Sequence, residues 1–264
     1  MFTERTLEDD VAQVREQHAP EALVLDCAEN FETLPSAQAE ELLLVTDSID
    51  PATYPEEWLP SDAPTVLRRY AGGELTVGMP GDGSVAWTTQ TDPPVVICKP
   101  LLEQTPDAFA SFLVAEALVE VGLGEPEQFL GFFEEQYRAF AEASRELLSP
   151  VETYQVAAAC YDAYLGLQTR ETFAAWDGPL FEAWLDAGER LTPRIDDLPS
   201  AMAQRRTSFA DAAELACNAV KHAGELPAPF EALNAAVYLE YGPEYAVQWI
   251  ERTADALVDA EGTG

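Results

Sequence analysis

One helix-forming run constrains the fold more than any other part of the sequence. Residues 105–123 open with a Thr-Pro pair, which suits the N-cap and first position of a helix, and glycines follow its apolar part. After the first turn the only charged residues are Glu116 and Glu120. A helix that is apolar nearly all round is expected to be buried. The sequence therefore predicts a central helix on which other elements pack.

Three predicted strands precede this helix. Residues 74–80 and 84–91 flank a GDGS turn at 81–84, where Asp-Gly supplies the positive φ of a tight hairpin. Residues 95–99 are nearly all apolar, which indicates a strand buried on both faces. We therefore expect a small three-stranded antiparallel sheet, at about 74–99, packed on the 105–123 helix.

The rest of the chain is predicted to be mainly helical, so the fold class is α+β with a majority of helix. Residues 21–31 fit either a buried strand or a helix, and helix is favoured. Residues 47–64, with four prolines, and residues 192–206 predict loops. Other helices are expected at 7–18, 36–45, 65–71, 125–147, 149–168, 179–190, 207–222, 227–241 and 243–259. One domain over 1–264 is expected, divided into N-terminal helices and a Pro-rich loop (1–73), the sheet and central helix (74–123), and a helical part (125–259).

Negative charge dominates the composition. The chain has 48 acidic and 14 basic residues, a net charge of -34, and only Lys99 and Lys221 are lysines. Such charge repels itself unless salt shortens the Debye length to ~3 Å at 1 M. In this the chain resembles cytoplasmic proteins of extreme halophiles, and protein families of unknown function from halophilic archaea in particular. That resemblance implies a cytoplasmic protein in concentrated salt. An acidic surface that binds cations or basic partners is the alternative.

Several function classes find no support in the sequence. Nucleic-acid binding needs a basic face, and the only basic doublets are Arg68–Arg69 and Arg205–Arg206. Four cysteines lie far apart without a CxxC pair, so a zinc site is not predicted; reduced thiols are expected, with one disulfide left open. No run resembles a signal peptide or reaches the about 18 apolar residues of a membrane helix. No cofactor is predicted, and a protein partner stays open.

Glu116 and Glu120 are the residues with the clearest chemical potential. They are four residues apart on one helix face, where like charges repel and resist desolvation. They either reach water along a narrow stripe, pair with an arginine such as Arg138 or Arg145, or hold a ligand or a hard metal through oxygen atoms. Lys99 is a third candidate, because ligand sites gather at strand ends, although an ordinary strand-terminal charge fits it as well.

The order of strands and helix over residues 74–123 resembles the core of the zincin metallopeptidases, in which a strand lies over a helix bearing His-Glu-x-x-His. The corresponding run here is Glu116-Ala117-Leu118-Val119-Glu120, so both histidines are replaced by glutamate and the general base by Ala117. The chain's only histidines are His18 and His222. The resemblance therefore implies a zincin-like frame without zinc hydrolysis, which needs histidine ligands and a base.

Two functions from different classes follow. Because no complete catalytic motif is present, the first is a non-enzymatic soluble interaction or scaffold protein adapted to high salt. The second is a divergent metal- or small-ligand-binding protein on a degenerate zincin-like frame, using Glu116 and Glu120. The burial of these two carboxylates separates the hypotheses.

Overall fold

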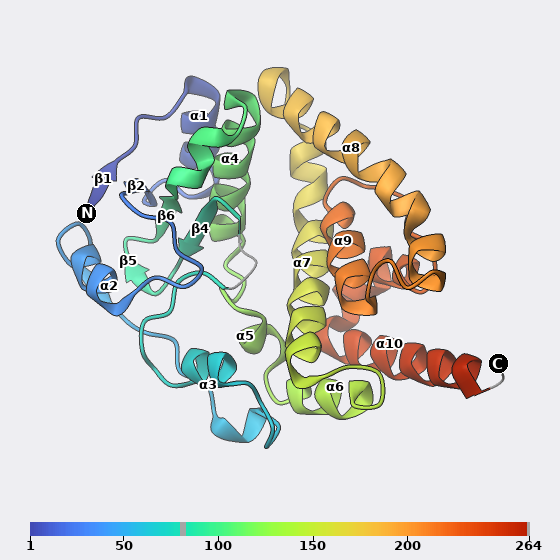
Figure 1. Ribbon diagram of the computed structural model, residues 1–264. Coiled ribbons are helices and arrows are strands. Elements are labelled where there is room, and N and C mark those ends of the chain that lie inside the picture. Colours follow the sequence, from blue (N-terminus) through green and yellow to red (C-terminus); the bar gives the residue numbers. More distant parts are fainter. Residues whose placement is uncertain (80–82, 263–264) are drawn as a thin grey trace. The chain divides into compact units, whose positions relative to one another are not determined.

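The computed structural model describes residues 1–79 and 83–262, and these form many helices and two small sheets (Figure 1). The predicted α+β class with a majority of helix is confirmed. The chain divides into two compact units. Unit 1 comprises Met1–Thr53, Arg69–Glu127 and Trp176–Ala183, and unit 2 comprises Tyr54–Arg68, Gln128–Ala175 and Trp184–Gly264. One domain over 1–264 stays a prediction.

A four-stranded mixed sheet forms the centre of unit 1. Its strand order is β1-β2-β6-β4, with β2 parallel to β6 and the outer strands antiparallel to their neighbours. A second, two-stranded sheet joins β3 to β5. The prediction of a three-stranded antiparallel sheet is thus wrong in strand number and direction, although β4 and β6 pair antiparallel as expected. The strands are β1 (Phe2–Glu4), β2 (Leu23–Cys27), β3 (Ser48–Ile49), β4 (Val85–Thr88), β5 (Thr91–Asp92) and β6 (Val95–Cys98).

Residues 74–79 form no strand, contrary to the prediction for 74–80. Their carbonyl groups are bonded by partners from different segments. The Leu34 N–H donates to the Val77 carbonyl at 2.8 Å, and the Tyr70 hydroxyl donates to the Gly78 carbonyl at 2.9 Å. Hydrogen bonds from such separate segments satisfy these backbone carbonyl groups without forming a β-sheet ladder. The last residue of the predicted strand and the first two of the GDGS turn lie outside the described residues.

The favoured helix at 21–31 is also wrong, because Leu23–Cys27 forms β2. Val24 pairs with Val96 and Leu25 with Ile97 in the parallel ladder, and all four side chains are buried. Helical spacing is a local signal, whereas this pairing joins segments some seventy residues apart. Burial in a pleated sheet decides strand formation more than local propensity does. The sequence reading missed β1 for the same reason.

Helices cover both faces of this sheet. α4 (Asp107–Leu123) lies against β4 and β6, and α1 (Asp9–His18) lies beside α4 (Figure 1). The predicted packing of the 105–123 helix on the sheet is therefore confirmed. The close approach needs Gly122, since a Cβ there would collide with the His18 carbonyl oxygen. On the other face α2 (Ser36–Leu42) completes a hydrophobic cluster that includes Phe2, Leu25, Leu34, Ala39, Leu42, Val95 and Ile97.

Unit 2 is helical. The helix predicted at 125–147 is interrupted at Glu134, whose φ is 49°, and the two helices predicted after 227 are replaced by a 3₁₀ turn and one long helix kinked at Gly242. The remaining helices of the chain are α3 (Thr65–Ala71), α5 (Phe129–Phe133), α6 (Gln136–Ser144), α7 (Pro150–Ala174), α8 (Gly178–Ala203), α9 (Phe209–Val220) and α10 (Ala236–Gly262), with 3₁₀ turns at Glu56–Trp58, Pro100–Gln104 and Phe230–Asn234.

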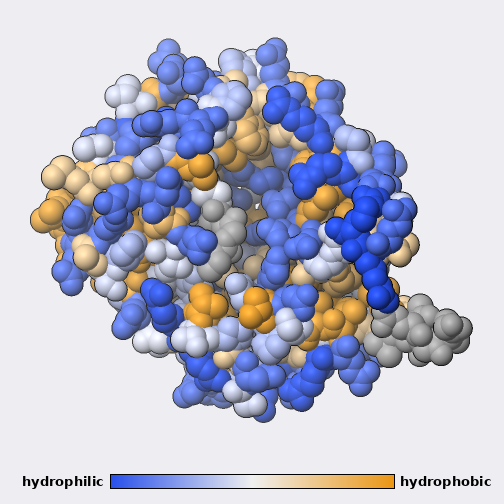
Figure 2. Space-filling view, viewed as in Figure 1, coloured by the Kyte–Doolittle hydropathy of each residue, from blue (hydrophilic) through white to orange (hydrophobic). Residues whose placement is uncertain are grey.

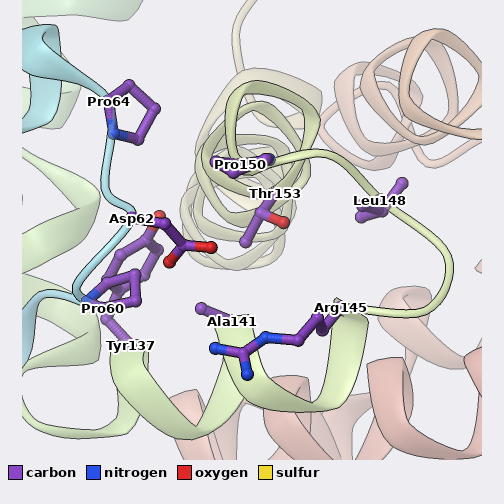
Figure 3. A pocket seen from close by; sticks show the side chains of 9 residues that line it. All are labelled: Pro60, Asp62, Pro64, Tyr137, Ala141, Arg145, Leu148, Pro150 and Thr153. Carbon is purple, nitrogen blue, oxygen red and sulfur yellow. The ribbon is translucent and has the colours of Figure 1, made fainter.

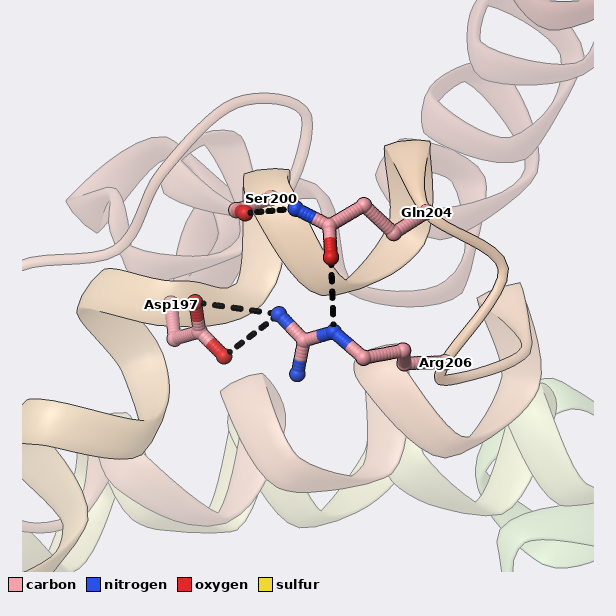
Figure 4. Close-up of polar contacts among 4 residues, drawn as sticks. All are labelled: Asp197, Ser200, Gln204 and Arg206. Atoms are coloured by element: carbon pink, nitrogen blue, oxygen red, sulfur yellow. Dashed lines mark hydrogen bonds and ion pairs between the residues drawn. The ribbon is translucent and has the colours of Figure 1, made fainter.

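The loop predicted at 192–206 is wrong, because α8 continues through Pro193 and Pro199 to Ala203. Ile195 and Leu198 are buried on one face, and this packing offsets the backbone hydrogen bonds that the prolines remove. Just beyond the helix, Arg206 Nη2 donates to both carboxylate oxygens of Asp197, at 2.9 and 3.2 Å (Figure 4). Side-chain contacts therefore stabilise the last turn of α8. The two prolines had led to the prediction of a loop there.

Candidate functional site

The two candidate glutamates of α4 have different surroundings. Glu116 is buried, with 6% of its surface exposed, so the predicted solvent-reaching stripe is wrong for this residue. Glu120 is half-buried, and its Oε2 accepts a 2.8 Å hydrogen bond from the Trp87 indole Nε1 on β4. A desolvated carboxylate needs donors of this kind. The bond ties α4 to the sheet, and a ligand-binding role for the pair stays a prediction.

Lys99 lies on the opposite face of the sheet from Glu120. Its N–H donates to the Ser84 carbonyl at 2.8 Å, which continues the β6 ladder by one residue. Side chains two apart on a strand share a face, so Lys99 points with Ile97 toward the α2 cluster. Its Nζ lies 4.6 Å from the centre of the Phe31 ring, which packs against that cluster. Trp87 points to the α4 face, so the structure does not bring the three predicted residues together.

Metal-binding geometry is not found in the part of the chain that the structure describes, where no group of three or more His, Cys, Asp and Glu side chains could hold an ion. The His222 Nδ1 lies 3.0 Å from the Trp184 carbonyl oxygen, and burial lowers the pKa of His222 to about 4. The four cysteines are buried free thiols. Among the described helices, none has the length and hydropathy to span a membrane.

A carboxylate that the sequence reading missed accepts several hydrogen bonds in unit 1. Glu127 Oε2 accepts from the Thr88 hydroxyl at 2.8 Å and from the Thr89 N–H at 3.0 Å, and Oε1 accepts from Gln90 Nε2 at 2.9 Å. Gln90 is itself fixed, because its Oε1 accepts from the Ala52 N–H at 2.9 Å. The residues Thr88, Thr89, Gln90 and Glu127, here the Glu127 cluster, join the β4–β5 turn to the segment after α4.

The pKa of Glu127 is raised to about 7. Burial is the main cause, since it disfavours the charged form, and the hydrogen bonds from Thr88, Thr89 and Gln90 oppose the rise. Glu127 therefore titrates near neutral pH. Its oxygens are occupied by donors of the protein, which makes the cluster a structural tie that responds to pH.

Unit 2 contains a pocket of about 100 Å³ between the Pro-rich segment before α3 and the α6–α7 connection. Its buried floor is formed by Tyr137, Ala141, Leu148 and Thr153. Asp62 and Arg145 are exposed at its rim and point toward the space between them (Figure 3). The remaining lining residues are Pro60, Pro64 and Pro150.

The two charges of this pocket are not used to bind each other. No ion pair within 4.0 Å joins Asp62 to Arg145, and neither side chain bonds to another residue in the described ranges 1–79 and 83–262. Among the described residues five arginines form ion pairs, for example Arg138 with Glu142 on α6 at 3.8 Å, whereas six others form none. Arg145 differs from those six in lining this pocket, where its guanidinium is open to an external anion.

Sequence reading could have found only part of this pocket. The Pro-rich run 47–64 marked a surface loop, and a loop of that kind often carries function. Arg145 was considered only as a partner for Glu116 and Glu120. Asp62 and Arg145 line one pocket only because of the tertiary structure, and no spacing in the sequence indicates that they do.

The surface also carries exposed apolar side chains. The face drawn in Figure 2 is mostly hydrophilic, with hydrophobic residues in small groups. The longest exposed apolar run follows α2, where Leu43, Leu44 and Val45 are 54%, 83% and 37% exposed.

Comparison with known proteins gives a family and no named activity. No curated protein and no solved structure matches the chain, so the zincin-like order of elements stays a prediction. The model of a family of unknown function, DUF7089, matches residues 1–257, which is nearly the whole chain. The chain therefore belongs to the DUF7089 family.

Proposed function

We propose that the chain is a non-enzymatic binding protein for a small charged solute, and that the pocket of unit 2 is its binding site. One observation carries the proposal: Asp62 and Arg145 line the same pocket, yet each is without an ion-pair partner among the described residues. Ligand sites combine apolar walls with a few convergent polar groups. The proline, alanine and leucine walls and the two charges of this pocket follow that pattern.

The proposal is tested with ligand-observed NMR on the full chain in KCl. The panel contains acetate, methylammonium, alanine and, as an uncharged member, glycerol. We expect at least one charged solute to bind wild type and to bind the Arg145→Gln or Asp62→Asn variant more weakly. Arg138→Gln is the matched control, because Arg138 is on α6 and outside the pocket lining. Binding that neither pocket variant changes, or no binding of any charged solute, contradicts the proposal.

We further propose that the protein works in a cytoplasm rich in salt. The net charge of -34 supports this, since screening at high ionic strength removes most of its self-repulsion. The four free thiols support a reducing compartment. The melting temperature should fall steadily as KCl is diluted, and a melting temperature independent of KCl would contradict the proposal.

An interaction protein is the second candidate, and the exposed run Leu43–Val45 favours it. The partner that we propose is a second copy of the chain. β1 is at the edge of the sheet, and Phe2 of this strand shares a hydrophobic cluster with Leu42 of α2, so an open strand edge lies near the exposed run. Light scattering in KCl should show a dimer that Leu44→Glu dissociates. A wild-type monomer at every concentration contradicts this candidate.

A further inference from the structure

We propose that the pocket of unit 2 selects a zwitterion, a compact molecule with a carboxylate and an ammonium group on neighbouring atoms, such as a small α-amino acid. The inference rests on the proposed function and specifies its ligand class. The carboxylate would bind at Arg145, and the ammonium at Asp62. Three features of the pocket support this assignment.

The first feature is the cationic end of the pocket. Arg145 directly follows α6, and its guanidinium extends along the open side of the pocket (Figure 3). The planar fork of a guanidinium matches the two oxygens of a carboxylate. An anionic group is therefore favoured on this side.

The second feature is the anionic end. The Asp62 carboxylate projects into the pocket from the Pro-rich segment (Figure 3). Tyr137 is 1% exposed, and burial together with the nearby Asp62 charge raises the pKa of its hydroxyl, which stays protonated.

The third feature is the size and lining of the pocket. A dry cavity of about 150 Å³ accepts benzene, so a pocket of about 100 Å³ suits a molecule of fewer non-hydrogen atoms. Its walls are small or cyclic apolar side chains: Pro60, Pro64, Ala141, Leu148 and Pro150. A short aliphatic substituent fits such walls, whereas a bulky side chain exceeds the available volume.

The inference is tested by titrating alanine, acetate and methylammonium into the full chain in KCl. Alanine should bind at least about tenfold more tightly than either half-molecule, because each charged end adds a charge-assisted hydrogen bond. Arg145→Gln and Asp62→Asn should each weaken alanine binding about tenfold or more. Acetate binding should be lost only in Arg145→Gln, and methylammonium binding only in Asp62→Asn.

Controls separate this inference from the proposed function. Arg138→Gln and Glu57→Gln remove one charge of each sign outside the pocket lining and should leave alanine binding within about twofold. If acetate or methylammonium binds as tightly as alanine, the pocket binds a single charge, and the inference is overturned while the proposed function stands. If none of the three binds wild type, the proposed function fails and the inference with it.

Discussion

The carboxylates of unit 1 and the charged groups of the unit 2 pocket are used in opposite ways. In unit 1, Glu120 accepts a hydrogen bond from Trp87, and Glu127 accepts from three donors of one turn. In unit 2, Asp62 and Arg145 line one pocket without an ion pair to each other in the described ranges. A carboxylate whose oxygens are bonded within the protein has little capacity left for a ligand. Unit 1 therefore uses these carboxylates for structure, whereas the two pocket charges of unit 2 have no such partner and carry the binding role that we propose.

Among the variants that we propose, Glu127→Ala and Asp62→Ala should differ most in their free energy of unfolding. Removal of the Glu127 carboxylate takes the acceptor from the Thr88 hydroxyl and the Thr89 N–H and one of the acceptors from Gln90 Nε2, and it should lower the free energy of unfolding by about 3 kcal/mol. Asp62→Ala removes an exposed charge and should change it by less than about 0.5 kcal/mol. Urea denaturation in KCl measures both. If both variants lose the same free energy of unfolding, the two carboxylates do not differ in their structural role.

The second prediction is that the free energy of unfolding depends on pH through Glu127. Burial raises the pKa of Glu127 from 4.5 to about 7 in the folded protein. The folded state therefore holds this proton more tightly than the unfolded state, and the stability contributed by Glu127 is full below pH 4.5 and falls as pH rises toward 7. The loss should be about 2 kcal/mol for a half-buried group.

This pH effect is measured as the difference in unfolding free energy between wild type and Glu127→Gln across that range. The subtraction cancels the other carboxylates, which both proteins share. A difference that does not vary with pH would show that Glu127 keeps an ordinary pKa.

The smallest effect concerns the bond between α4 and the sheet. Trp87→Phe keeps most of the ring but removes the indole donor to Glu120, and it should lower the free energy of unfolding by about 1 kcal/mol. Trp58→Phe in unit 2 is the control, since no described residue accepts from its indole. The double variant Trp87→Phe with Glu120→Gln should cost less than the sum of the single variants. Additive costs would mean that the bond contributes nothing.

The sequence predicted those features whose signals are local. The apolar run 105–123 is read directly from neighbouring residues, and it forms α4 on the sheet. β2 was misread, since its partner β6 lies far along the chain and parallel pairing leaves no local pattern. α8 was read as a loop at Pro193 and Pro199, because the burial of one helix face that tolerates them is a tertiary property.

The candidate site was predicted less well than the fold, for a related physical reason. Glu116 and Glu120 drew attention because charge is conspicuous inside an apolar run, but Glu116 is buried and Glu120 is bonded to the sheet. Asp62 and Arg145 look like two surface charges among many. Only their common pocket distinguishes them, and a pocket is formed by segments that the sequence does not place together.

The most direct test of the account is the melting-temperature shift that saturating alanine produces in Glu120→Gln and in Asp62→Asn, both in the same KCl buffer. A ligand that binds only the folded state raises the melting temperature in proportion to its affinity and concentration. We expect Glu120→Gln to keep the wild-type shift, and Asp62→Asn to keep the wild-type melting temperature without ligand but to lose the shift. A shift that disappears in Glu120→Gln and persists in Asp62→Asn would contradict it.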